Sequence, residues 1–218
     1  MRLAQQLGFF QTTDLEPLMS YVTQQAAPGD VPGVLRALET YGTTVAYMMH
    51  LGPHARQVLE QVLREHRPRR ILEIGMYCGY SSLCMAHALP SSRITGIEHS
   101  RSSPALCQAL FAYARVEQQI EIIRARAEKA IPTLPTAYDL VLMDHNKSLY
   151  LQDFTLLLLH QRLAMGGVIV ADNVNLGAAK AFTEHLQSRP DFSVTVHVFP
   201  RHGDPEQTDS MLVGVYQP

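Results

Sequence analysis

The pattern of apolar positions along the chain changes near residue 70. Before that point, apolar residues recur at helical spacing and no run is typical of a strand. Three helices are predicted there: Leu15–Gln25, Val31–Met49, and one that begins near Pro53 and ends before Pro68. We expect these helices to cap a sheet rather than to form a separate domain.

From Arg70 onward, short apolar runs alternate with helical segments. The predicted strands are Ile71–Ile74, Arg93–Ile97, Ile120–Ile123, Tyr138–Met143 and Gly167–Ala171. The predicted helices that follow them are Ser81–Leu89, Pro104–Val116, Ala127–Leu134, Leu149–Leu163 and Ala178–Ser188. Five βα units in succession predict a parallel sheet with right-handed crossovers.

The end of the chain breaks this alternation. Phe192–Phe199 and Met211–Tyr216 are predicted strands with no helix between them, and the intervening Pro200–Ser210 is polar and rich in turn residues. We expect these two strands to pair antiparallel. The whole pattern predicts an α/β protein with a single domain, in which residues 1–68 form the helical cap and residues 69–218 the core.

Composition narrows the kinds of partner. The chain has 218 residues, 46% hydrophobic and 17% charged, with a net charge of −2, and no basic stripe, so we expect neither nucleic acid nor a membrane as a partner. The N-terminus lacks the apolar core of a signal peptide, and no apolar run is long enough to span a membrane. Three cysteines without metal-ligand spacing favour a reducing compartment, so a cytoplasmic location is predicted.

Two polar motifs stand where predicted buried strands end. Asp144-His145-Asn146-Lys147 follows one strand, and Asp172-Asn173 closes the next. Ligands of open α/β sheets bind at such strand ends. Two carboxylates and an amide offer hard oxygen ligands, which suit Mg²⁺ or Ca²⁺ better than zinc, and Lys147 places a titratable amine beside them.

Both motifs have simpler interpretations. Asp144 and Lys147 could form an ordinary surface ion pair at the start of a helix, a weak interaction. Asp172-Asn173 could cap the helix that begins near Gly177. Both alternatives would have to hold for the metal site to be absent.

A glycine-containing loop follows the first predicted strand. Gly75 and Gly79 lie between Glu73 and Ser82, where they allow a tight turn and a close approach of the backbone to a ligand. The spacing is not that of the dinucleotide motif GxGxxG. Glu98 closes the second strand, about 20 residues past the loop, where an acid can accept hydrogen bonds from both hydroxyls of a ribose. Together they predict a cofactor that contains adenosine.

These features together resemble the Mg²⁺-dependent catechol O-methyltransferase family. The resemblance runs from about Tyr21 to Tyr216 and includes three further phrases: Ala27-Pro28-Gly29-Asp30, Glu65-His66-Arg67-Pro68 and Tyr77-Cys78-Gly79-Tyr80-Ser81. It implies a Rossmann-like, seven-stranded, mostly parallel sheet with an antiparallel last strand and helices on both faces. It also implies the cofactors S-adenosylmethionine and Mg²⁺.

The resemblance also assigns roles to residues. It implies Asp144, Asp172 and Asn173 as Mg²⁺ ligands and Lys147 as the base that takes the proton of the reacting hydroxyl. The implied cofactor contacts are Leu51, Glu73, Gly75, Tyr77, Ser81, Glu98, His99, Glu128, Asp144 and His145. For His145 and Tyr77, ordinary packing is the simpler alternative.

Several positions depart from the family pattern, mostly around the acceptor. Asn146 and Tyr47 stand where the family has tryptophans, and the family's proline after the metal-binding strand is lost near Gly177. The adenine-side segment reads Ala125-Arg126-Ala127-Glu128. The family's glutamate that binds the second catechol hydroxyl falls at His202 or Gly203, with Asp204 and Glu206 close by.

The predicted function is Mg²⁺-dependent transfer of a methyl group from S-adenosylmethionine to a hydroxyl of a catechol-type vicinal diphenol, by a monomer or weak homodimer. One alternative is an O-methyltransferase of larger caffeoyl- or flavonoid-like diols. Another is a non-catalytic, methyltransferase-like binding protein, which the altered acceptor residues favour. A nicotinamide-dependent oxidoreductase is disfavoured because the chain lacks GxGxxG.

Overall fold

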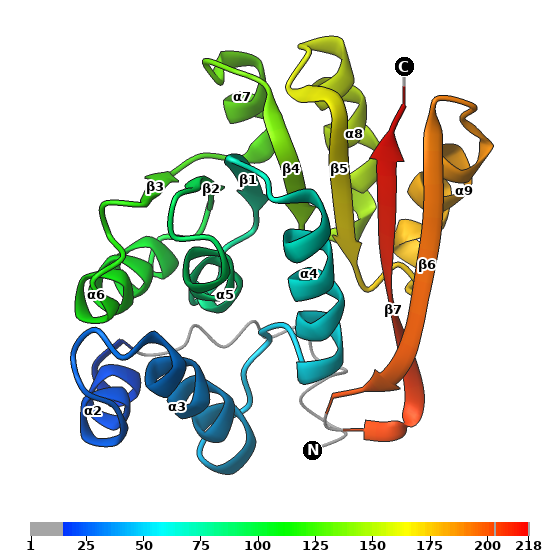
Figure 1. The fold of residues 1–218 in the computed structure, drawn as a ribbon. Helices are drawn as coiled ribbons and strands as arrows, with labels where there is room; N and C mark the ends of the chain where they lie inside the picture. Colours follow the sequence, from blue (N-terminus) through cyan, green and yellow to red (C-terminus); the bar gives the residue numbers. More distant parts are fainter. Residues whose placement is uncertain (1–14, 203, 218) are drawn as a thin grey trace.

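The computed structural model describes residues 15–202 and 204–217, which are built around a seven-stranded sheet (Figure 1). Its strand order is β3-β2-β1-β4-β5-β7-β6, and β7 runs antiparallel to both of its neighbours while the other pairs are parallel. The strands are β1 (Arg70–Ile74), β2 (Arg93–Ile97), β3 (Ile120–Ile123), β4 (Tyr138–Met143), β5 (Leu163–Asp172), β6 (Phe192–Arg201) and β7 (Asp204–Tyr216). The predicted fold class is confirmed.

Helices cover both faces of this sheet. One face carries α2 (Leu15–Gln25), α3 (Val31–Thr44), α4 (Pro53–His66), α5 (Tyr80–Ala88) and α6 (Ser103–Ala114). The other carries α7 (Ala127–Ala130), α8 (Tyr150–Leu159) and α9 (Lys180–Ser188), with the short 3₁₀ turns η1 (Ile131–Thr133), η2 (Lys147–Leu149) and η3 (Gly177–Ala179). Strand β4 supplies both cores, because Leu140 and Leu142 face the first layer while Val141 and Met143 face the second.

Helix α3 is shorter than predicted. It ends at Thr44 instead of Met49, and its last turn contains two threonines whose hydroxyls donate to carbonyls one turn earlier: Thr43 to Glu39 O at 3.0 Å and Thr44 to Thr40 O at 2.7 Å. Such side-chain bonds compete with helix continuation. The helical spacing of apolar residues continues past the end of the helix, into residues 45–52, which form neither helix nor strand in the structure.

The C-terminal hairpin is longer than predicted. Pro200–Ser210 was expected to be a polar connection, but β6 continues to Arg201 and β7 begins at Asp204, with Phe199 opposite Asp209. Strand β6 is the edge of the sheet, where a proline is tolerated because no neighbour needs its missing N–H. The extension places residues 208–210 of β7 beside residues 173–175, which directly follow β5.

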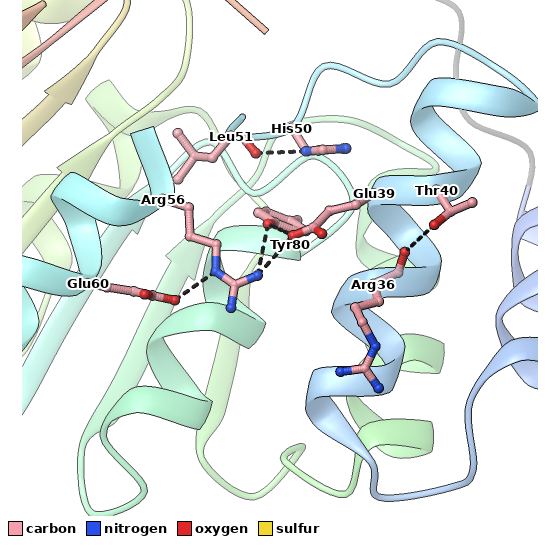
Figure 2. A network of polar contacts seen from close by, with 8 residues as sticks. All are labelled: Arg36, Glu39, Thr40, His50, Leu51, Arg56, Glu60 and Tyr80. Atoms are coloured by element: carbon pink, nitrogen blue, oxygen red, sulfur yellow. Dashed lines mark hydrogen bonds and ion pairs between the residues drawn. The ribbon is translucent and has the colours of Figure 1, made fainter. Parts of the chain in front are cut away.

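A polar network fastens the predicted helical cap to α5 (Figure 2). Arg56 on α4 bonds Glu39 on α3 at 2.9 Å and Glu60 at 2.7 Å, and the Tyr80 hydroxyl at the start of α5 donates to Glu39. The ring of His50 stacks on that of Tyr80 at 4.5 Å between centroids. Segment 45–52 is thereby attached to the helix that follows the glycine loop, while the division into cap and core stays a prediction.

Two further observations concern helix length and cysteines. Within the described residues, no helix combines the length and apolar character needed to cross a lipid bilayer. Cys78, Cys84 and Cys107 are all buried free thiols. Burial raises the pKa of the Cys78 thiol to about 12, so it stays protonated at neutral pH.

Candidate active site

The glycine loop and the acidic tetrapeptide meet at the centre of the sheet. Strands β1 and β4 are parallel neighbours. The strand that follows β1 in the chain, β2, lies on one side of this pair, and the strand that follows β4, β5, lies on the other side. The carboxyl ends of β1 and β4 are therefore the topological switch point of the sheet. Gly75 has a φ of +90°, and a Cβ there would come within 2.6 Å of the Asp144 carbonyl oxygen. Only glycine combines a favourable positive φ with the absence of a Cβ, so the structure requires glycine at this position of the loop.

Glu98 holds the glycine loop from the end of β2. Its carboxylate accepts hydrogen bonds from the backbone N–H groups of Met76 at 3.1 Å and Tyr77 at 2.9 Å, and from Ser100 N at 2.7 Å. A carboxylate offers about four acceptor sites, and the side chain is 7% exposed. Glu98 thus shapes the loop itself, and its contact with a ribose stays a prediction.

Glu73 lies beneath the same loop and contacts another predicted cofactor residue. It is fully buried, and the hydroxyls of Ser81 and Ser82 donate to its two carboxylate oxygens. Burial raises the pKa of Glu73 to about 7, against the opposing effect of the two serine hydrogen bonds. Glu73 and Ser81 therefore join β1 to the first turn of α5, and their contacts with a cofactor stay predictions.

A pocket of about 110 Å³ opens beside the loop. It is lined by Ile74, Gly75, Ile97, His99, Ala125, Arg126, Ala127, Glu128, His145, Asn146 and Leu149. Four of the predicted cofactor residues (Gly75, His99, Glu128 and His145) share this wall. Of the others, Leu51 is buried in the segment before α4 and does not line this pocket.

The ring of His145 is fixed by a residue that the sequence analysis missed. His145 Nε2 lies 2.8 Å from a carboxylate oxygen of Asp153, which is fully buried on α8. Among the described residues, His145 Nδ1 and Asp153 Oδ1 are buried without a hydrogen-bond partner. A lone acid directly before the apolar run Phe154–Leu159 was the available signal. The pair fixes the orientation of an imidazole on the pocket wall, and the contact of His145 with a cofactor stays a prediction.

Asp144 and Lys147 form an ion pair of 2.7 Å, but not on the surface. Their side chains are only 18% and 14% exposed. Asp172 is 5% exposed, and its Oδ1 has no partner among the described residues. Burial and the nearby charge of Asp144 raise the pKa of Asp172 well above its usual range. A buried carboxylate oxygen without a partner is costly, and a bound cation is a group that would satisfy it.

Tyr150 contacts the ends of the two strands from which the two carboxylates project. Its hydroxyl lies 2.6 Å from Met143 O, at the end of β4, and 3.1 Å from Asp172 O, at the end of β5. Burial raises the pKa of Tyr150 well above its usual range, so the hydroxyl keeps its proton as a donor. The ring also lies beneath Lys147, whose Nζ is 5.4 Å from the ring centroid.

Asn173 completes the predicted ligand set. Its alternative role as a helix cap is wrong, because η3 and α9 begin without a side-chain cap. Its amide nitrogen instead donates to Asp209 at 2.9 Å, which leaves Oδ1 as the end that can bind a cation. Within residues 15–202 and 204–217, no group of three His, Cys, Asp or Glu side chains is arranged to hold a metal. The two carboxylates with this amide oxygen still fit a hard cation such as Mg²⁺.

The acceptor side is more open. Tyr47 is 64% exposed in segment 45–52, and the ring of His202 lies 5.9 Å from that of His50. Asp204 accepts from Gln207 at 2.8 Å near the hairpin turn, Glu206 is exposed, and Gly203 lies outside the described residues. The hairpin acid that contacts the ligand set is Asp209, which the sequence analysis did not single out.

The fold and this site together define a class of protein. A sheet of this order, with a glycine loop after β1 and an acid at the end of β2, is that of the S-adenosylmethionine-dependent methyltransferases. The chain belongs to the O-methyltransferase family, whose model matches residues 32–190. The predicted family is therefore confirmed.

Individual relatives agree with this assignment. The chain is 34% identical to the human transmembrane O-methyltransferase over 84% of its own length and 65% of that protein. It is 33% identical to the mouse catechol O-methyltransferase over 84% of its own length and 71% of that protein. Among solved structures, the O-methyltransferase TomG from Streptomyces achromogenes, in complex with SAM, has a TM-score of 0.73 at 25% identity, over 96% of this chain and 100% of TomG. The chain thus spans about two thirds of the length of these mammalian relatives.

Proposed function

We propose that the chain transfers a methyl group from S-adenosylmethionine to one hydroxyl of a catechol-type vicinal diphenol, with Mg²⁺ as a cofactor. The observation that carries the proposal is the largely buried pair Asp144–Lys147, which lies near the unpartnered Asp172 oxygen and against the glycine loop. The relative named catechol O-methyltransferase supports the substrate class.

Lys147 would remove the proton of the reacting hydroxyl. A phenol with a pKa near about 10 is a poor nucleophile at neutral pH, so it needs help to ionise. A neutral lysine amine can take the proton, and the phenolic oxygen then forms a bond to the methyl carbon as the bond from that carbon to sulfur breaks. S-adenosylhomocysteine is the leaving product, and the proton stays on Lys147.

The remaining site residues would bind Mg²⁺ and S-adenosylmethionine and orient the reactants. Asp144, Asp172 and Asn173 would bind Mg²⁺, which when bound supplies Lewis-acid stabilisation of negative charge on the acceptor oxygen. The pocket lined by His145 and Glu128 would take the adenosine part of the cofactor. Much of the rate enhancement would come from holding the two reactants in line.

A second candidate is an O-methyltransferase of larger diols. It is favoured by the open acceptor side, where Tyr47 is 64% exposed and Met49 44% exposed. Asn146 is exposed too, where the family pattern has a tryptophan. These side chains leave room for a substituent on the aromatic ring.

A panel of acceptors tests the proposal. Methyl transfer from labelled S-adenosylmethionine is measured for catechol, its 1,3-isomer resorcinol, and caffeic acid. Catechol should be methylated about 100-fold faster than resorcinol, because only neighbouring oxygens can share one cation and be aligned by it. Faster transfer to caffeic acid than to catechol would favour the larger substrates. Equal rates for catechol and resorcinol would contradict the vicinal diol.

A further inference from the structure

We infer that Asp209 is a positioning residue that turns the amide of Asn173 so that its oxygen faces the cation. This inference rests on the Mg²⁺ site of the proposed function and adds a residue to it. Asp209 lies in β7, two residues before the part that pairs with β5, and Asn173 directly follows β5, so the two side chains are 36 residues apart in the chain.

Three hydrogen bonds join these segments. Asn173 Nδ2 donates to Asp209 Oδ2 at 2.9 Å, Val174 N donates to Ser210 O at 3.1 Å, and Asn175 Nδ2 donates to Thr208 O at 3.0 Å. The backbone bond and the flanking amide fix where the two side chains stand. The short contact between Asp209 and Asn173 is therefore set by the strand pairing around it.

The contact with Asp209 determines which end of the Asn173 amide faces the cation site. Of the two ends of an asparagine side chain, only the oxygen can bind a cation, and the amide can rotate to exchange them. A carboxylate can only accept, so Asp209 admits one orientation, with Nδ2 toward itself. Asn173 also has a φ of +53°, a left-handed conformation that asparagine tolerates and that confines its side chain.

Asp209 is itself held in place. Its second oxygen, Oδ1, accepts from Ser210 N at 2.8 Å. Both carboxylate oxygens are therefore used, one by its own strand and one by Asn173. Partners of this kind, which orient a metal ligand without touching the metal, commonly change metal affinity about 10- to 100-fold.

Substituting Asp209→Asn tests the inference through metal binding alone. Isothermal titration with Mg²⁺ is carried out on the full chain in the presence of S-adenosylmethionine and without an acceptor. An asparagine puts an acceptor oxygen at only one of the two positions that Oδ1 and Oδ2 occupy, so it cannot replace both the bond from Ser210 N and the bond from Asn173 Nδ2. We expect about 10- to 100-fold weaker Mg²⁺ binding, with an unchanged far-ultraviolet circular dichroism spectrum. Glu117→Gln removes the same charge from an exposed site before β3, at the opposite edge of the sheet, and should leave the affinity unchanged.

A double-mutant cycle with Asn173→Asp separates orientation from simple charge. A carboxylate at position 173 presents an oxygen whichever way it turns, so Asp209→Asn should cause little further loss in that background. The same loss in both backgrounds would mean that Asp209 acts by charge alone and would overturn the inference. Equal Mg²⁺ affinity in the wild type and in Asp209→Asn would overturn it too. A wild-type chain that binds no Mg²⁺ overturns the proposed metal site, and the inference with it.

Discussion

Lys147 sits where it can either neutralise Asp144 or accept a proton. Its Nζ lies 2.7 Å from Asp144 Oδ1, and the pair is mostly shielded from water. A shielded pair loses stability when one partner is removed, because the other charge is left unpaired. A test of the base must therefore keep the positive charge while removing the capacity to take a proton.

Lys147→Arg makes that distinction. An arginine stays protonated at all relevant pH values, so it can pair with Asp144 but cannot act as a base. We expect kcat to fall about 10²- to 10⁴-fold, the usual contribution of a general base, while the affinity for S-adenosylmethionine stays within about twofold. Lys180→Arg, at a 73% exposed position on α9, is the matched control and should keep full activity. Retained turnover in Lys147→Arg would show that the residue serves only as a charge.

At the scale of elements, the site depends on strand ends that the sequence predicted well. The bounds of β2, β3 and β4 agree with the predicted runs. Strands β2 and β4 are buried along most of their length, whereas β3, at the edge of the sheet, is only partly buried. The hairpin was mispredicted because, at the sheet edge, polar residues fill strands as readily as loops. Asp209 was missed for this reason, because its contact with Asn173 can be recognised only when β7 is known to lie next to β5.

The contact between β1 and α5 should make stability depend on pH. The pKa of Glu73 on β1 is raised to about 7 from an ordinary value of 4.5. Between those values the unfolded chain releases the proton first, so rising pH favours unfolding, by a total on the order of 3 kcal/mol once the buried group has also ionised. We expect the free energy of unfolding of the wild type, measured by urea denaturation without metal, to fall across this window.

Glu73→Gln should remove that component, because an amide does not titrate while its oxygen can still accept from a serine. Its free energy of unfolding should fall less between about pH 4.5 and pH 7 than that of the wild type. Glu117→Gln, at an exposed site, should keep the wild-type slope. If all three proteins show the same slope, Glu73 is not the buried acid that titrates in this range.

At the scale of the whole molecule, the sheet brings distant parts of the chain together at the carboxyl ends of its parallel strands. The glycine loop, the acidic tetrapeptide and Asp172-Asn173 all follow strands whose carboxyl ends lie together, which is why their convergence was predictable from sequence. The contacts made by the partners that orient them were not predictable, although Asp153 stands out in the sequence as a lone acid before an apolar run. Asp153 contacts His145 from a helix, and Asp209 contacts Asn173 from an antiparallel strand. Neither contact corresponds to a characteristic spacing of residues in the sequence.

In the proposed function, methyl transfer needs a cation held by Asp144, Asp172 and Asn173. The most direct measurement is the rate of methyl transfer to catechol, at saturating S-adenosylmethionine, with Mg²⁺, with excess EDTA, and after Mg²⁺ is restored. We expect the rate to fall about 100-fold or more in EDTA and to return when Mg²⁺ is added back. Equal rates with and without EDTA would contradict it.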